Sequence, residues 1–574
     1  MKSGFRTLAV SVAFAAAAWA QTPVIGGLAN NYSYVPAGLP NYGIAQGSIF
    51  DIFGTNLVAS SSALQDPQKA SLPSSLNGIT VNVTVNGTTT HPLMYFAIHG
   101  NPDEIAAVLP SATPVGTGTI TVSTSAGTSA TFPIVVVQSA FGILTMNGYG
   151  SGMGAIQDYN YNYNLLSLAN SAKPGDILVL WGTGLGPVTG DESKLQQQQD
   201  MGSNYPIEVD IGGVSATVSY HGRSVFPGLD EVFIIVPQGI SGCNNSVVIR
   251  HKNNNIVSNV ATAPIAASGG TCSDPTIGIT SSVLQKCAAS GCAFGGINVN
   301  KTTTNTPATT IQTPAGPITV PGSTSTTDGL SAYFYKYTPA QFVTGAAYGP
   351  SVISIGSCSV YTYAYSGQTP PAVPTGAVAT PLNAGTISAT TPNATASMPY
   401  KNGAYFTSGT GGTLIPASGG NFSFNNGSGG PDIGAFSASS GAQITLGAPL
   451  TWTNAPTTVT RSNGLTVTWT GGTAGTYVTL FGSSLAFAPD STTSYVGAYF
   501  WCTAPASAGS LTVPATVLLA FPASGSITTS GISIPLPGSL SLTNSSNYAT
   551  FTAANLDWGY VEGTYATSNS VTFQ

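Results

Sequence analysis

The hydrophobic residues of this chain recur at every second position in short runs, and clusters of glycine, asparagine, proline and serine separate the runs. Residues 79–85 and 214–220 show this alternation clearly. A period of two is typical of a β-strand with one buried face, whereas a helix repeats its apolar positions every three or four residues. Turn pairs such as Asn86-Gly87 and Gly212-Gly213 stand between the runs, as in β-hairpins. The pattern predicts an all-β protein, with residues 281–289 as one short helix.

One phrase of the sequence occurs twice. Residues 47–57 read Gly-Ser-Ile-Phe-Asp-Ile-Phe-Gly-Thr-Asn-Leu, and residues 175–185 read Gly-Asp-Ile-Leu-Val-Leu-Trp-Gly-Thr-Gly-Leu. Two further matches follow in the same order, 83–87 with 209–213 and Asp103-Glu104 with Asp230-Glu231. Three matches at a nearly constant spacing indicate a duplicated domain.

In each copy of the phrase an aromatic residue precedes a glycine, as Phe53 precedes Gly54 and Trp181 precedes Gly182. The apolar residues before the glycine fit a buried strand. The glycine then allows either a positive φ or the close approach of another backbone. The two copies share no titratable residue, so we interpret these four residues as structural rather than catalytic.

The phrase resembles the opening strand of IPT/TIG domains, which are immunoglobulin-like modules. The ordered pair of copies resembles a tandem module of uncharacterised secreted bacterial proteins, and the resemblance covers residues 31–272. It implies two β-sandwiches, 31–138 and 139–270, whose motif residues are structural, and it carries over no catalytic residue.

Two further β domains are expected after the tandem module. Residues 276–454 are rich in serine, threonine and glycine and predict a β-rich domain. Residues 455–574 contain a third version of the phrase at 475–485, which favours another immunoglobulin-like β domain.

The N-terminus predicts export. Lys2 and Arg6 precede an apolar run, and Ala18-Trp19-Ala20 fits a cleavage site, so residues 1–20 are interpreted as a signal peptide. The run is short for a bilayer span, and no later stretch is long and apolar enough to be one. We therefore expect a secreted or cell-surface protein without a transmembrane segment in the mature chain.

Charge is scarce, because only 6% of the residues are charged. Removing Lys2 and Arg6 with the signal leaves 11 basic residues (13 minus 2) against 19 acidic ones, a net charge of −8. An acidic chain lacks the basic surface that nucleic acids require, and this also argues against the DNA binding of some TIG domains. A surface of hydroxyls and amides suits contact with glycans or matrix, and it also suits resistance to proteases that cut at lysine and arginine.

The six cysteines of an exported chain are expected to form disulfides. Six cysteines allow 15 pairings, and we predict Cys243–Cys272, Cys287–Cys292 and Cys358–Cys502. Zinc binding is the alternative, but no CxxC pair occurs and no histidine stands beside a cysteine. We expect no metal site and no cofactor.

The candidates for chemistry are few. No Gly-x-Ser-x-Gly elbow occurs, and the Asp-Glu pairs point to opposite faces of their strands, so we assign no catalytic residue. Tyr159, Tyr161 and Tyr163 recur with period two, and an extended strand would show all three rings on one face. That face is either a stacking surface for sugars or a partner protein, or it packs on the second repeat.

These observations favour an exported, non-enzymatic protein of surface or matrix, with a role in adhesion, glycan or protein binding, or structure. The alternative is a secreted hydrolase with its chemistry in 276–574 and the tandem module as a spacer. After residue 275 the chain has no histidine and only five acids, which disfavours the hydrolase. The acids are Asp328, Asp432, Asp490, Asp557 and Glu562.

Overall fold

The computed structural model describes residues 21–574 except 60–62, 66–70, 196, 274–278, 344–352, 367–378, 473–474, 490, 492 and 546–547. The predicted signal peptide, 1–20, lies outside the described residues. The described chain is built of β-strands, with short helices at α1 (Ser281–Ser290), α2 (Pro339–Val343) and α3 (Ala515–Leu518), and the all-β prediction is confirmed. None of the described helices has the length and apolar character needed to cross a membrane.

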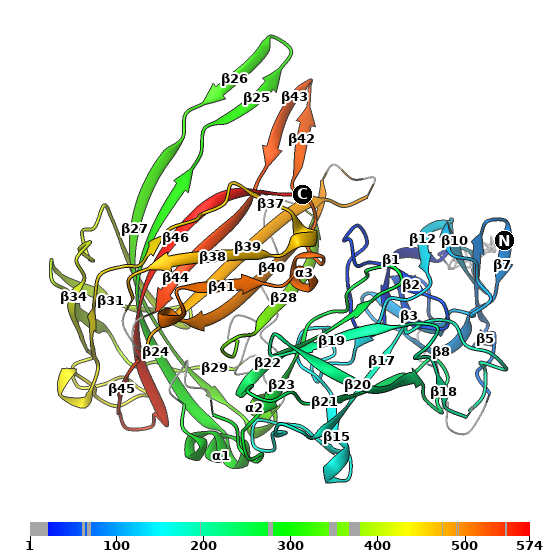
Figure 1. The fold of residues 1–574 in the computed structure, drawn as a ribbon, viewed down its shortest axis with the longest axis horizontal. Helices are drawn as coiled ribbons and strands as arrows, with labels where there is room; N and C mark the ends of the chain where they lie inside the picture. Colours follow the sequence, from blue (N-terminus) through cyan, green and yellow to red (C-terminus); the bar gives the residue numbers. More distant parts are fainter. Residues whose placement is uncertain are drawn as a thin grey trace, which may run out of the picture.

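The first repeat is a sandwich of two sheets around one apolar core (Figure 1, blue). One sheet has the order β1-β3-β9-β8-β4 and the other β2-β12-β10-β6-β5, with β7 and β11 as short additions. The strands are β1 (Val24–Asn30), β2 (Ile44–Ala45), β3 (Ile49–Thr55), β4 (Ala63–Leu64), β5 (Ser75–Leu76), β6 (Ile79–Val85), β7 (Thr88–Thr90), β8 (Leu93–Ile98), β9 (Asp103–Val108), β10 (Gly116–Thr124), β11 (Gly127–Thr128) and β12 (Phe132–Val137).

The second repeat encloses its own core with strands in the order β14-β23-β22-β19-β20-β21-β17-β15-β16 (Figure 1, cyan to green). The strands are β13 (Gly142–Ile143), β14 (Gly152–Met153), β15 (Ile156–Asp158), β16 (Asn164–Leu165), β17 (Ile177–Thr183), β18 (Gln199–Asp200), β19 (Ile207–Ile211), β20 (Val214–Arg223), β21 (Asp230–Ile235), β22 (Gly242–His251) and β23 (Ala261–Ile265).

The duplicated phrase has the same register in both repeats. In the first, β3 pairs with β9 so that Gly54 faces Asp103; in the second, β17 pairs with β21 so that Gly182 faces Asp230. Each aspartate then accepts hydrogen bonds from the turn after the glycine. Asp103 Oδ2 accepts from the N–H of Leu57 at 2.9 Å, and Asp230 Oδ2 accepts from that of Leu185 at 2.8 Å. The acids conserved between the copies therefore hold the turn in place.

Gly54 and Gly182 are needed for close approach and not for a positive φ, since neither adopts one. A Cβ at Gly182 would collide with the ring of Phe141 and the carbonyl oxygen of Gly142, and one at Gly54 would collide with the carbonyl oxygen of Val24. Another strand lies against the backbone at each glycine, β1 in one repeat and β13 in the other.

Gly182→Val is accordingly expected to destabilise the second repeat by more than about 1 kcal/mol, because an added side chain must displace Phe141 or β13. Differential scanning calorimetry of the variant checks this. Gly27→Val serves as the control, because a Cβ at Gly27 meets no atom within 4 Å and Gly27 does not adopt a positive φ. An unchanged melting temperature for Gly182→Val would contradict the steric argument.

The remainder of the chain forms one large sheet of long strands (Figure 1, green to red). Its order is β28-β40-β39-β44-β46-β24-β27-β33-β32, with β29, β37 and β45 as additions. The strands are β24 (Cys292–Thr306), β27 (Ser323–Tyr337), β28 (Cys358–Ser366), β29 (Thr380–Pro381), β32 (Tyr400–Lys401), β33 (Ala404–Thr410), β37 (Thr458–Val459), β39 (Tyr477–Phe487), β40 (Ser494–Pro505), β44 (Gly538–Ser545), β45 (Ala549–Phe551) and β46 (Trp558–Phe573).

This sheet joins the two ranges that the sequence assigns to separate domains. β24 pairs with β46 over twelve residues, and β28 pairs with β40 over nine. The division at 454/455 therefore does not separate two sheets. The third version of the phrase also differs from the first two, because β39 continues as a strand through Gly482 instead of turning there.

Two small sheets cover one face of the large sheet and enclose two separate cores with it. One small sheet is formed by β31 (Thr395–Met398), β30 (Ile387–Thr390), β34 (Gly420–Asn425) and β35 (Gln443–Leu446), and the other by β36 (Thr451–Trp452), β38 (Leu465–Thr470) and β41 (Ser510–Val513). Val248 of β22, with Val257 and Val260 in the segment after it, joins the core beneath the small sheet of β36, β38 and β41. This contact packs the second repeat against the edge strand β28.

The three disulfides of the structure are Cys243–Cys272, Cys287–Cys292 and Cys358–Cys502, the pairs expected from the sequence. The first ties the second repeat to the segment leading into α1, and the second joins α1 to β24. The third links the neighbouring strands β28 and β40.

Candidate functional site

The two faces of the large sheet differ in character because successive residues of a strand point to opposite sides. In β24, Ile297 and Val299 are buried in the core on the covered face, while Asn298 and Asn300 on the other face are half-buried. In β46, Val561 points into the core, and Glu562 and Thr564 point away from it. The face opposite the small sheets is therefore lined by polar and aromatic side chains.

Amides and hydroxyls occupy the middle of this face. We call them the polar field, which consists of Asn298, Asn300, Thr302, Ser539, Ser541, Thr564 and Ser568. They are partly organised by their own hydrogen bonds, since Asn300 Nδ2 donates to Thr564 Oγ1 at 3.1 Å and Thr302 Oγ1 donates to Asn300 Oδ1 at 3.1 Å. None of the seven side chains carries a charge.

Aromatic rings flank the polar field on β28, β40 and β39. We call them the aromatic band, which consists of Tyr361, Tyr363, Tyr365, Phe481, Phe487, Tyr495, Tyr499 and Trp501. The strand register places these residues on one face, with Tyr361 opposite Tyr499 and Phe481 opposite Trp501. The ring centroids of Phe481 and Trp501 lie 5.5 Å apart, and those of Tyr363 and Tyr499 lie 4.6 Å apart.

The band is partly accessible. Tyr361 and Tyr363 are buried, whereas the other six rings are half-buried and present part of their surface. Phe481 also faces Ser541 across the β39–β44 pair, and Ser483 and Ser539 share a hydrogen bond of 2.8 Å. Stacking surface and hydrogen-bonding groups thus stand side by side on one sheet face.

A second aromatic group lies at the other end of β46. The hydroxyls of Tyr333 and Tyr560 are hydrogen-bonded to each other, and the rings of Trp558 and Tyr560 lie 4.7 Å apart. Phe406 on β33 is 65% exposed, although its ring is large and apolar. Glu562 is next to this group and accepts a hydrogen bond of 3.2 Å from the hydroxyl of Tyr548. Burial raises the pKa of the Glu562 carboxyl, while hydrogen bonds from Ser545 and Tyr548 lower it.

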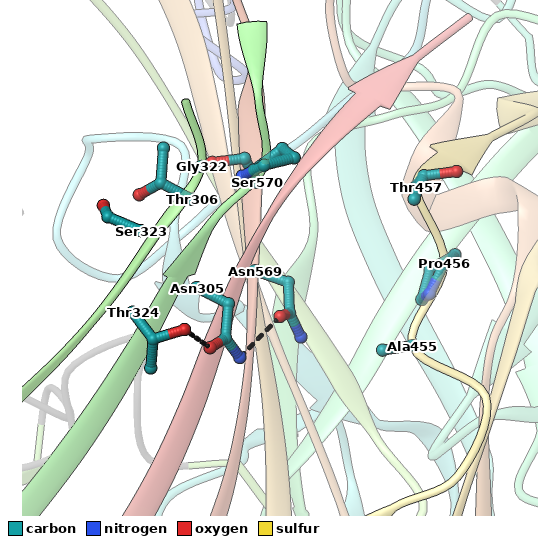
Figure 2. Close-up of a pocket in the computed structure, with 11 residues that line it drawn as sticks. Asn305, Thr306, Gly322, Ser323, Thr324, Ala455, Pro456, Thr457, Asn569 and Ser570 are labelled. Carbon is teal, nitrogen blue, oxygen red and sulfur yellow. Dashed lines mark hydrogen bonds between the residues drawn. The ribbon is translucent and has the colours of Figure 1, made fainter. Parts of the chain in front are cut away.

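A cleft of about 350 Å³ opens on the covered face, between the two cores (Figure 2). Figure 2 shows Asn305 and Asn569 pointing toward each other, with Asn305 Nδ2 donating to Asn569 Oδ1 at 3.0 Å and Thr324 Oγ1 donating to Asn305 Oδ1 at 2.9 Å. Ala455, Pro456 and Thr457 form the facing wall. No charged residue lines the cleft, so a neutral polar ligand suits it better than a charged one.

The tyrosines singled out from the sequence do not lie on a strand, which corrects that prediction. Residues Tyr159–Tyr161 form a 3-10 turn capped by Asp158, and Asn162 and Tyr163 adopt positive φ, because β15 and β16 form a hairpin with these residues at its tip. All three rings are 44–47% exposed.

The three rings also make different contacts. Those of Tyr159 and Tyr163 lie edge to face at 5.2 Å, while the Tyr161 hydroxyl accepts a hydrogen bond of 2.7 Å from Lys173 Nζ. A role of these tyrosines in binding stays a prediction.

Sequence reasoning missed the aromatic band, although a signal was present. Residues 361–365 read Tyr-Thr-Tyr-Ala-Tyr, which is an alternating aromatic strand like the tyrosine segment at 159–163. The difference between a strand and a turn at these two places lies in their neighbours, since β28 has β40 to pair with. Among the residues that the structure describes, no cluster of three or more histidine, cysteine, aspartate or glutamate side chains could hold a metal ion.

Comparison with known proteins gives no family. No family model matches the chain and no curated protein matches it. Among solved structures, it is similar to SGBP-B from a complex xyloglucan utilization locus of Bacteroides uniformis, with 11% identity over 69% of this chain and 88% of that one and a TM-score of 0.16.

Two further solved structures give similar values. The S-layer protein rSbsC(31-844) has 11% identity over 95% of this chain and 54% of its own, with a TM-score of 0.18. SGBP-B of the Bacteroides ovatus mixed-linkage glucan utilization locus has 12% identity over 49% and 63%, with a TM-score of 0.20. Values this low do not place the chain in the class of any of these proteins.

Proposed function

We propose that this chain is an exported, non-enzymatic surface protein that binds neutral polysaccharide through the aromatic band and the polar field. The observation that carries the proposal is the half-buried rings of Tyr495, Tyr499 and Trp501 beside uncharged amides and hydroxyls on one sheet face. Aromatic faces stack on the apolar faces of sugar rings, and amides and hydroxyls bond sugar hydroxyls. The tandem IPT/TIG-like module, 31–272, is proposed as the part that holds this sheet.

Export and surface placement are supported by the disulfides. Three bridges in one chain are expected to form and persist in an oxidising compartment outside the cytoplasm. The scarcity of charge supports a neutral ligand, since a charged polymer would gain little from an aromatic band and a polar field that contain no basic residue.

Binding without catalysis is proposed because of how the acids of 276–574 are placed. Glycoside hydrolysis uses two carboxyl groups that flank one bond. Asp328 and Glu562 point to opposite faces of the large sheet. On β24, Lys301 is the partner of Asp328 and Asn298 is the partner of Glu562. These two partners are three positions apart, and residues an odd number of positions apart on a strand point to opposite faces. Asp328 is also engaged by the N–H of Leu414 at 3.1 Å.

The other described acids of this region have structural partners. Asp557 accepts from the N–H of Ala293 at 2.8 Å, and Asp432 accepts from that of Asn383 at 2.7 Å. Asp490 lies outside the described residues. A hydrolase would need a second carboxyl near Glu562, and this arrangement favours a binding role over the hydrolase alternative.

The proposal predicts that the mature protein is retarded in native gels containing mixed-linkage glucan, xyloglucan or galactomannan, and not in gels containing alginate. Trp501→Ala is expected to weaken the retarding interaction about fivefold, the equivalent of roughly 1 kcal/mol for one lost stacking contact. Affinity electrophoresis over a range of polysaccharide concentrations measures this.

Two matched variants separate this site from its alternatives. Asn569→Ala alters the cleft of Figure 2 on the other face, and the triple Tyr159/Tyr161/Tyr163→Ala variant removes the exposed hairpin tyrosines. Both are expected to bind like the parent, with melting temperatures recorded for every variant. Binding that survives Trp501→Ala and is lost with either of the other two would assign the site elsewhere.

A further inference from the structure

A small sheet projects from the ends of the long strands, away from the rest of the protein (Figure 1, top). It consists of two hairpins in the order β26-β25-β43-β42. The hairpin of β25 (Thr309–Thr313) and β26 (Gly316–Val320) stands between β24 and β27, and that of β42 (Gly525–Thr529) and β43 (Ile532–Leu536) precedes β44. The sheet is a single layer, and such a sheet has no core of its own.

The register aligns four isoleucines in one row across this sheet. Ile318 pairs with Ile311 in the first hairpin, and Ile534 pairs with Ile527 in the second. Gln312 pairs with Ser533 between the hairpins, which brings Ile311 beside Ile534. Residues paired across strands lie on the same face, so the four side chains form a continuous row.

Three more aliphatic residues lie on the same side at two-residue spacing. We call the set the aliphatic face, which consists of Ile311, Ile318, Val320, Ile527, Ile532, Ile534 and Leu536. Ile318 is 56% exposed, Val320 46% and Ile534 38%. The opposite face is polar, with Thr310 and Thr319 hydroxyls 3.4 Å apart and Thr528 donating to Ser533 at 3.3 Å. The sheet is thus amphipathic, with its apolar side accessible to a partner.

The lack of charge around the aliphatic face restricts the kind of partner that can bind it. No charged residue occurs in 302–327 or in 519–545. A charged protein surface would find no complementary charge here, and a membrane would find neither lysine or arginine for its headgroups nor tryptophan or tyrosine for its interface. Two copies of the same uncharged aliphatic face meet without electrostatic repulsion, and a two-fold axis lets this one patch serve as the contact surface on both copies.

We propose that the aliphatic face is a self-association surface, on which a second copy of this chain packs face to face to form a two-layer sandwich. Face-to-face packing supplies the missing second layer and buries the isoleucine rows of both copies. Strand addition is disfavoured at the β26 edge, because Pro317 lies in that strand and proline lacks an N–H for a new neighbour.

The size of the face sets the strength of the contact. A sheet of four strands with five residues in each covers on the order of 300 Å². Two copies would bury roughly 600 Å², below the ~1,200 Å² at the lower end of stable interfaces. The contact is therefore weak between free chains and gains strength when many chains are held at one surface.

Cysteine cross-linking tests the proposal at the row of isoleucines. All six native cysteines are in disulfides, so Ile311→Cys adds one free thiol at the centre of the aliphatic face. Gln312→Cys is the matched control, one residue away on the polar face. Mild oxidation of the full mature chain is expected to give a disulfide-linked dimer with Ile311→Cys and little with Gln312→Cys. Equal cross-linking of both variants, or none of Ile311→Cys, would overturn the proposal.

Sedimentation velocity at rising protein concentration gives a second readout, in which the chains carry only their native cysteines. Ile318→Asp is expected to abolish the concentration-dependent rise in sedimentation coefficient, whereas Thr319→Asp adds the same charge on the polar face and should leave the rise unchanged. A parent chain that stays monomeric at all concentrations contradicts self-association. Flotation of that monomer with phosphatidylcholine vesicles would instead identify a lipid partner and overturn the proposal.

Discussion

Replacing Asp230 by alanine is expected to destabilise the second repeat by about 3–5 kcal/mol, the usual cost of removing one partner of a buried ion pair. Asp230 is fully buried and its Oδ1 lies 2.5 Å from Nε of Arg223, whose side chain is 3% exposed. The other oxygen accepts from the N–H of Gly184 and of Leu185, both at 2.8 Å. The variant would leave a buried guanidinium without a counter-charge and two turn N–H groups without an acceptor.

The effect should extend to the first repeat, because Arg223 Nη2 also donates to the carbonyl oxygen of Gly47 at 2.8 Å. Calorimetry is the appropriate measurement, since a chain of several sandwiches can unfold in more than one transition. Asp191→Ala is the control, because Asp191 pairs with Lys194 in the solvent, where water screens the attraction and the pair contributes little to stability. Equal melting profiles for the two variants would show that the buried pair is not a major source of stability.

Removing the Cys358–Cys502 disulfide with a double alanine variant is expected to cost about 5 kcal/mol, given a closed loop of this length in the chain-entropy model. The bridge spans 144 positions and joins the edge strand β28 to β40, so it restrains a large part of the unfolded chain. Its loss should also loosen the rings of Tyr361 and Tyr363, which lie on the same strand. Guanidinium unfolding followed by tryptophan fluorescence measures the change.

The Cys287–Cys292 bridge is the matched comparison, because it spans only 5 positions and should contribute about 2 kcal/mol in the same model. The ratio of the two losses in unfolding free energy is more informative than either loss alone. A larger loss at the short bridge than at the long one would mean that local packing around α1, and not loop length, determines the stabilisation.

Much of the local structure follows from the sequence. Alternation of apolar and polar residues predicts the strands, as at 79–85, because a strand with one buried face has a period of two. The duplicated phrase predicts two similar sandwiches, and the structure gives Gly54 and Gly182 equivalent partners. The even number of cysteines in an exported chain predicts bridges, and the three formed are the three expected. Each of these inferences depends on residues that act through their immediate neighbours or through covalent bonds.

The sequence predicts the types of side chain in the candidate site and not where on the fold they come together. The sequence shows that charge is scarce and that aromatic residues alternate with small polar ones. It does not show which strands meet, and it therefore predicts a strand for the tyrosines at 159–163, which form a turn in the structure. Their alternation is the same as that of 361–365, so the pattern alone could not separate them.

The tertiary structure alone decided how distant strands combine. β28, β40 and β39 form the aromatic band although more than 100 residues separate the first strand from the other two, and β24 and β46 join the two ends of a region that the sequence divides at 454/455. Pairing between such strands depends on register and on the entropy of closing long loops, which no local period encodes. The side chains that each strand presents on its two faces follow from the order of its residues. The fold determined which faces are covered by a core and which remain open to a ligand or to a second copy.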